Sequence, residues 1–172
     1  MSEKAVKPKI EDIVNNVLSG DVLNNALDFV AYLRENKLSP IWSAKNVWTV
    51  SYKTFRVCFI RLNGAADYHN LSAGSWNISP FIGEYDANSL SGELKEIAWA
   101  NKKNCRTCGQ CALPLSAIFG KEFATSCECS LLFVNPNSKT IECTKQLVAL
   151  RRNEIKDGRA RKHQCVAMKD RK

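Results

Sequence analysis

The stretch "NVWTVSYKTFRVCFIRL", residues 46–62, decides the fold of this chain. It holds two runs rich in aromatic and β-branched residues, one on each side of Lys53. In the first run Trp48, Val50 and Tyr52 alternate with other residues, which is typical of a strand with one buried face. Because only one or two residues separate the runs, we expect an antiparallel hairpin that turns around Lys53.

The second run alternates in the same way and predicts a second strand. Its period of two predicts Phe55, Val57 and Phe59 on one face, and Thr54, Arg56, Cys58 and Ile60 on the other. A cysteine in the middle of a strand is most simply a small core residue, so Cys58 is expected to be buried and unreactive.

Two helical patterns precede the hairpin. Apolar residues share one helical face over residues 10–18 and, after a break at Ser19–Gly20, again over residues 22–36. Asp21 is expected to cap the second helix, and residues 37–40 to form a loop. The two apolar faces consist of Ile10, Ile13, Val14, Val17 and Leu18, and of Leu23, Ala26, Leu27, Val30 and Leu33.

Four more elements are predicted after the hairpin. Two are strands: one in "SWNISPF" that ends near Pro80, and a short one in "SLLFVNP" that stops at Asn135–Pro136. A helix is expected in "SGELKEIAWANKK", with Leu94, Ile97 and Ala98 facing inward. A last helix is expected from Asn137 or Ser138, with Ile141, Thr144, Val148 and Ile155 on one face.

These patterns together predict an α+β fold with N-terminal helices, an antiparallel sheet of three to four strands, and a C-terminal helix. We expect a single domain over residues 1–157, which includes a cysteine-rich metal-binding lobe at residues 101–130. A basic flexible tail is expected at residues 158–172. With 172 residues, 45% of them hydrophobic and 24% charged, the composition is that of a globular protein.

The net charge of +8 is uneven along the chain. From Arg151 to Lys172 there are nine Lys or Arg and three Asp or Glu, whereas the rest is nearly neutral. The tail is expected to be solvated, and the alternative is that it binds nucleic acid or another acidic partner.

Neither a membrane span nor a signal peptide is expected, because no long apolar run is present and "MSEKAVKPKIED" has no apolar core. We therefore predict a cytoplasmic protein with reduced thiols. In a reducing compartment, eight cysteines favour metal binding or thiol chemistry over disulfides.

The cysteines gather in "KKNCRTCGQCALP", residues 102–114, where Cys105, Cys108 and Cys111 have C-x2-C-x2-C spacing. Zinc in a structural site takes four such ligands, so we predict a zinc site made by these three and Cys127, with Cys129 as the alternative fourth ligand. Lys102, Lys103, Arg106 and Lys121 are close enough in the sequence to offset the charge of four thiolates.

A [4Fe–4S] cluster is the alternative cofactor, since its ligands have similar spacing. Two features argue against this cluster. Leu115 stands where a compact ferredoxin motif would have its fourth cysteine, and Cys127 is followed by Glu128 rather than by proline. Free or reactive thiols are the third possibility. Cys143 in the last helix and Cys165 in the tail lack ligand spacing.

Other candidate sites are weaker. His69 lies beside Asp67 in a predicted loop, where a hydrogen-bonded histidine is commoner than a base or a ligand. The chain has no serine-hydrolase or nucleotide-binding motif. Aromatic residues near the sheet are expected to be core rather than the lining of an apolar pocket; they are Trp42, Trp48, Trp76, Phe81 and Tyr85.

The stretch from Ala26 to Leu62 resembles the small YdhG-like α+β domains of bacteria, which share a helix, a loop with Pro and Trp, and a strand pair with Tyr-Lys at the turn. The pattern "CRTCGQC…IFGKEF…C" resembles hypothetical cysteine-rich proteins of anaerobic bacteria. These resemblances imply a bacterial cytosolic origin and no particular activity.

The prediction for function is a non-enzymatic cytosolic module with a cysteine-ligated structural metal, zinc, and a small-molecule or protein partner that the sequence does not identify. An iron–sulfur or thiol redox protein is one alternative. A nucleic-acid-binding accessory protein that uses the basic tail is the other.

Overall fold

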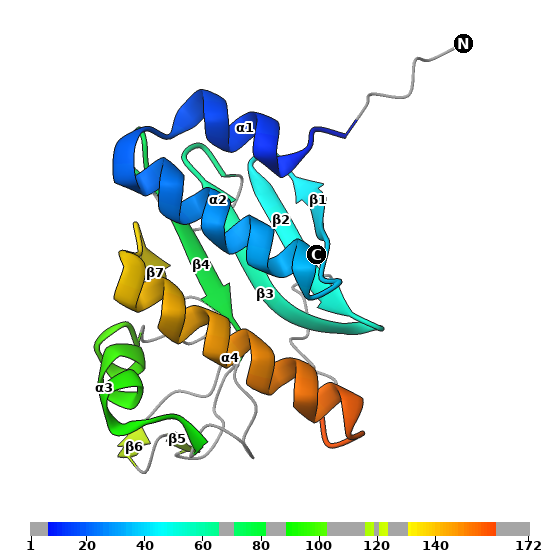
Figure 1. The fold of residues 1–172 in the computed structure, drawn as a ribbon, viewed down its shortest axis with the longest axis vertical. Coiled ribbons are helices and arrows are strands. Elements are labelled where there is room, and N and C mark those ends of the chain that lie inside the picture. The colour runs from blue at the N-terminus through cyan, green and yellow to red at the C-terminus, as the bar shows by residue number, and fades with distance from the viewer. Residues whose placement is uncertain are drawn as a thin grey trace, which may run out of the picture.

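The computed structural model describes residues 7–65, 71–81, 89–102, 116–118, 121–123 and 131–160. Its helices are α1 (Ile10–Val17), α2 (Gly20–Glu35), α3 (Gly92–Ala100) and α4 (Ser138–Lys156). Its strands are β1 (Pro40–Ala44), β2 (Val47–Tyr52), β3 (Phe55–Leu62), β4 (Trp76–Pro80), β5 (Ser116–Ile118), β6 (Lys121–Phe123) and β7 (Phe133–Val134). This is the α+β fold that the sequence predicts (Figure 1).

The main sheet is antiparallel throughout, in the order β1-β2-β3-β4-β7, with β5 and β6 as a separate pair. The predicted count of three to four strands is therefore too low. The missed strand in the main sheet is β1, which forms one edge and pairs Trp42 with Trp48. It is short and starts at a proline, and the apolar Ile41 occupies an outward position with 58% of its surface exposed, so its sequence does not show the apolar–polar alternation of a half-buried strand.

The predicted hairpin is confirmed. Tyr52 pairs with Phe55, and Lys53 makes the turn with a φ of 54°. The predicted faces of β3 are partly wrong, because the register shifts after Val50 and leaves Val57 as an extra residue. A bulge of this kind puts two consecutive side chains on one face. Val57 and Cys58 are accordingly both buried in the main core.

Beyond the bulge, Ile60 and Leu62 also belong to the core that the helices cover, whereas Phe59 points to the opposite face with Arg61. Helices α1, α2 and α4 all lie on the first of these faces (Figure 1). The largest fully buried side chains of this core come from α1, from α2 and the loop after it, and from strands β2, β3 and β4. They are Ile10, Phe29, Leu33, Leu38, Trp48, Ile60, Leu62, Trp76 and Ile78.

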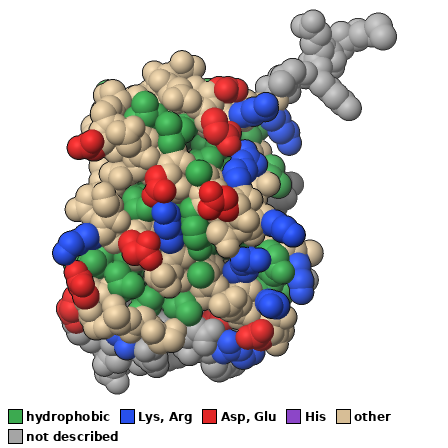
Figure 2. Space-filling model, in the orientation of Figure 1, with side chains coloured by type: hydrophobic (Ala, Val, Ile, Leu, Met, Phe, Trp, Pro, Cys, Tyr) green, Lys and Arg blue, Asp and Glu red, His purple; other side chains and the backbone are tan. Residues whose placement is uncertain are grey.

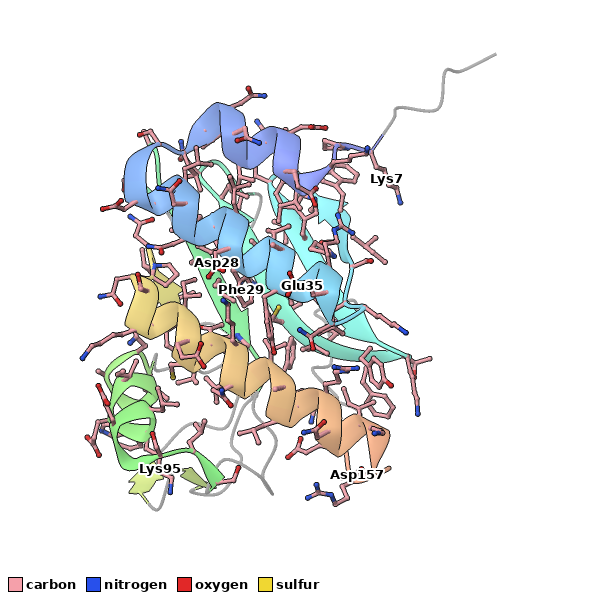
Figure 3. All side chains as sticks on the ribbon, in the orientation of Figure 1. Lys7, Asp28, Phe29, Glu35, Lys95 and Asp157 are labelled. Atoms are coloured by element: carbon pink, nitrogen blue, oxygen red, sulfur yellow. The ribbon has the colours of Figure 1, made fainter. Side chains whose placement is uncertain are left out.

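The helical faces agree with the sequence in α1, α2 and α4. The expected cap is wrong, since α2 begins at Gly20 with Ser19 at its N-cap, and Asp21 lies in the first turn. Lys145 of α4 joins this helix to α2. Its Nζ lies 2.8 Å from Oδ2 of Asp28, a residue of α2 (Figure 3). Its carbonyl accepts a hydrogen bond from the hydroxyl of Tyr32.

A second, smaller core joins α3, α4 and β7. Helix α3 starts at Ser91, whose Oγ accepts a hydrogen bond from the Leu94 N–H. Ala98 is buried there and Leu94 and Ile97 are half-buried, as predicted. The buried members of this small core are Leu90, Ala98, Leu131, Phe133, Cys143 and Leu147.

Helix α4 ends in a turn that includes the first residues of the predicted tail. Gly158 has a φ of 73°, a conformation that glycine adopts without strain. The N–H groups of Arg159 and Ala160 both donate to the carbonyl of Glu154, and Ala160 packs against the main core. Within the described residues, no helix combines the length and the apolar character that crossing a membrane requires.

Candidate functional site

The predicted metal ligands Cys105, Cys108, Cys111 and Cys127, and the alternative Cys129, lie outside the described residues. They belong to residues 103–130, which we call the cysteine segment. The structure nevertheless describes the points at which this segment starts, turns and ends, and these points limit how far apart the cysteines can lie.

The two ends of the cysteine segment meet. Lys102, just after α3, and Leu131, just before β7, form an antiparallel bridge, and the N–H of Leu132 donates to the carbonyl of Asn101 at 2.9 Å. Leu131 is 1% exposed and belongs to the small core, so the base of the loop is anchored to α3 and α4.

The middle of the cysteine segment holds a second antiparallel pairing. Strands β5 and β6 pair Ser116 with Phe123 and Ile118 with Lys121, so only Phe119 and Gly120 lie between the strands. The sequence patterns did not indicate this hairpin, because strands of three residues are too short to show a clear alternation.

The two pairings divide the cysteine segment into two connections that share both ends. Residues 103–115 run from the bridge to the hairpin and carry Cys105, Cys108 and Cys111. Residues 124–130 run from the hairpin back to the bridge and carry Cys127 and Cys129. Both groups of cysteines are thus confined between the same two fixed points.

The reach of the chain sets an upper limit on the distance of these cysteines from the bridge. Cys105 is three residues from the bridge and Cys127 is four, which at ~3.5 Å per residue limits these distances to about 11 Å and about 14 Å. The first connection has nearly twice as many residues as the second.

The two described cysteines are buried in the packed cores. Cys58 is fully buried in β3, and its burial strongly raises the pKa of the thiol, an effect that nearby Arg61 only partly offsets. Burial raises the pKa of Cys143 to about 12, with a smaller contribution from Glu142, and its Sγ donates to the carbonyl of Leu94 at 3.4 Å. These raised pKa values favour the protonated, unreactive thiol at neutral pH.

The remaining predicted sites have mixed outcomes. Trp48, Trp76 and Phe81 are buried, which confirms them as core, and Trp42 is half-buried. His69, Asp67 and Tyr85 lie outside the described residues. Within the ranges that the structure describes, no three His, Cys, Asp or Glu side chains come together as metal ligands.

Sequence patterns missed a polar row on the sheet face that α1, α2 and α4 leave uncovered. Arg61 of β3 and Asn77 of β4 are direct cross-strand neighbours, and Arg61 Nη1 donates to Ser79 Oγ at 3.0 Å. The Arg61 guanidinium also lies 4.8 Å from the centre of the Phe59 ring. All three polar residues are buried. The alternation in the sequence did not reveal this polar row, because the bulge at Val57 reverses which face the residues of the second half of β3 lie on.

Searches of protein-family models, curated proteins and solved structures found no match to this chain. The resemblance of residues 26–62 to the YdhG-like domains therefore stays a prediction, as does that of the cysteine pattern to proteins of anaerobic bacteria.

Proposed function

We propose that the cysteine segment binds a structural zinc ion through Cys105, Cys108, Cys111 and Cys127, and that the protein is a cytosolic, non-enzymatic module ordered in part by this metal. The observation that supports the proposal is the pair of antiparallel pairings, Lys102 with Leu131 and Ser116 with Phe123. They confine five thiols of one closed loop between two shared ends.

The position of Cys127 favours it over Cys129 as the fourth ligand. Cys127 lies in the middle of its connection, four residues from Phe123 and four from Leu131. Cys108 and Cys111 flank the middle of the other connection. Cys129 is only two residues from Leu131 at the bridge, so its reach from the base is shorter than that of Cys127.

Zinc fits the donor set because it prefers four thiolate or imidazole ligands in a closed tetrahedron, at Zn–S distances of about 2.3 Å. Four thiolates around Zn²⁺ leave a net charge of −2, which cations must offset. Lys102, at the base of the loop, is half-buried, with its Nζ 4.5 Å from the Trp99 ring centre. It brings a positive charge to the start of the connection that holds three of the ligands.

The test is metal analysis of the anaerobically purified full chain, with Cys108→Ser as the test variant and Cys165→Ser as the control. We expect one zinc per chain in the wild type and in the control, and a loss of zinc in Cys108→Ser. The control makes the same chemical change at a cysteine outside the proposed set.

Two results would contradict the proposal. Equal zinc in Cys108→Ser and the wild type would remove Cys108 from the ligand set. A brown protein that contains iron and sulfide, with broad visible absorption, would identify the site as an iron–sulfur centre instead.

A further inference from the structure

The turn that follows β3 contains the only asparagine of the chain that is followed directly by glycine, Asn63 with Gly64. The N–H of Ala65 donates to the carbonyl of Leu62 at 3.0 Å, so residues 62–65 form a hydrogen-bonded turn. Gly64 has a φ of 74°, a conformation that glycine adopts without strain at the third position of such a turn. The turn therefore places a side-chain amide next to the backbone nitrogen of a residue that has no Cβ.

The side-chain amide of Asn63 and the backbone nitrogen of Gly64 are both available. Among the residues that the structure describes, neither of these groups forms a hydrogen bond. Gly64 is exposed and Asn63 is half-buried, so water reaches the turn from outside. The backbone of Asn63 is held instead, because its N–H donates to the carbonyl of Ser75 at 3.0 Å and its carbonyl accepts a hydrogen bond from Nδ2 of Asn46.

Two comparable positions elsewhere in the described residues are protected by hydrogen bonds. Asp157 also precedes a glycine, but the N–H of Gly158 donates to the carbonyl of Ile155 at 3.3 Å. Asn137 precedes a serine, and its Oδ1 accepts hydrogen bonds from the N–H and the hydroxyl of Thr140, at 3.0 and 2.7 Å. Asn63 differs from both because the two groups that would have to react are left without such bonds.

We propose that Asn63 is a site of spontaneous deamidation, in which the backbone nitrogen of Gly64 attacks the side-chain carbonyl carbon of Asn63. The nitrogen of Gly64 gives its proton to a base from the solvent and forms a bond to Cγ, which closes a succinimide ring. The bond between Cγ and Nδ2 breaks, and the side-chain nitrogen takes up a proton and leaves as ammonia. The absence of a Cβ on Gly64 keeps the approach to this nitrogen open.

Water then opens the succinimide ring at either of its two carbonyl carbons. If the new bond to Cγ breaks, the product is aspartate with the original main chain. If the bond between the nitrogen and the main-chain carbonyl carbon breaks, the product is isoaspartate, and the main chain then runs through Cγ. Both steps exchange protons, water and ammonia only, so no oxidant or reductant takes part.

The modification would change the connection between β3 and β4. Either product adds a negative charge to the turn, and isoaspartate also lengthens the main chain by one methylene group. The hydrogen bonds of Asn63 with Ser75 and Asn46 depend on the present backbone, so isoaspartate should weaken them. This inference is independent of the proposed zinc site.

The test is incubation of the full-length folded protein in mildly alkaline and in mildly acidic buffer, followed by digestion and tandem mass spectrometry. We expect Asn63 to convert several-fold faster than Asn137 and to give both aspartate and isoaspartate. The conversion should be faster in the alkaline buffer, because the nitrogen of Gly64 must lose its proton. The control variant is Asn63→Gln, which keeps an amide but needs a larger ring, so the product at this position should be lost.

Three results would overturn the proposal. The first is an unmodified Asn63 in the folded protein after the same residue has converted in urea-unfolded protein, since the fold would then prevent the attack. The second is aspartate without isoaspartate, which would exclude the ring intermediate. The third is conversion of Asn137 as fast as that of Asn63, which would show that the hydrogen bonds around these amides do not decide their reactivity.

Discussion

At the residue scale, the polar face of the main sheet holds the side-chain amide of Asn77, which is buried without a hydrogen bond to any other described residue. Asn77 lies in β4 with an exposed fraction of 0%, and among the residues that the structure describes neither its side-chain nitrogen nor its oxygen has a hydrogen-bond partner. A buried polar group without a partner costs about 1–3 kcal/mol, because it has lost its hydrogen bonds to water. The fold tolerates this cost in a strand whose five residues are all buried.

Asn77→Val should therefore raise the free energy of unfolding by about 1 kcal/mol, since valine loses nothing on burial and favours strands. Ser79→Ala is the matched variant on the same strand and face. It should lower that free energy by about 1.5 kcal/mol, because Arg61 loses the acceptor of a charged hydrogen bond. Urea denaturation measures both values. A loss of stability in Asn77→Val as large as in Ser79→Ala would show that Asn77 does have a partner.

Single residues also mark the limits of sequence-based prediction here. The alternation in residues 46–62 correctly predicted Trp48 and Val50 in the core and the turn at Lys53. It could not predict that Val57 is an extra residue, since a bulge leaves no local signature when its neighbours are also apolar. That one residue decides whether Phe59 or Ile60 faces the helices.

At the element scale, helices were the most predictable part of the chain. Helix α4 buries Ile141, Thr144, Val148 and Ile155, as its period indicates, because nineteen residues give the pattern five turns in which to repeat. Strand β1 and the β5–β6 hairpin were missed because three to five residues give too few repeats, and β1 is an edge strand with one exposed face.

The end of α4 gives a prediction about its cap. Gly158 has a φ of 73° and Gly92, in the first turn of α3, has no positive φ; an added Cβ would meet nothing within 4 Å at either position. Gly158→Ala should therefore lower the free energy of unfolding by about 1 kcal/mol through backbone strain alone. Gly92→Ala should leave it unchanged or raise it slightly, since alanine favours a helix.

Thermal or urea unfolding of the two variants checks this prediction. If both variants have the same stability as the wild type, the turn at residues 158–160 contributes nothing to the end of α4. In that case the domain would end at Asp157, where the sequence places the start of the tail.

At the scale of the whole molecule, the fold keeps the helix-covered face of the main sheet apart from the base of the cysteine segment. Helices α1, α2 and α4 cover one face of the sheet, whereas the cysteine segment starts and ends beside α3, at the small core (Figure 1). The sequence indicated a basic tail after residue 157, but it could not show that Arg152 of α4 contacts Asn36 at the end of α2, because such long-range contacts depend on how the elements pack.

The ligand set of the proposed metal site could be predicted only as a pattern of cysteine spacing. Spacing indicated three ligands in residues 105–111 and left the fourth open between Cys127 and Cys129. The bridge at Lys102–Leu131 and the β5–β6 hairpin add information that the spacing does not contain. The two connections that carry the cysteines both run between this bridge and this hairpin.

The central claim is that a metal, rather than an apolar core, orders the cysteine segment. The most direct test is hydrogen exchange of the full chain, followed by mass spectrometry, with and without prior removal of metal by a chelator. We expect amides of residues 103–130 to lose protection when the metal is removed, while those of the β2–β3 hairpin, residues 47–62, keep theirs. Unchanged protection of residues 103–130 in the metal-free protein would contradict the claim.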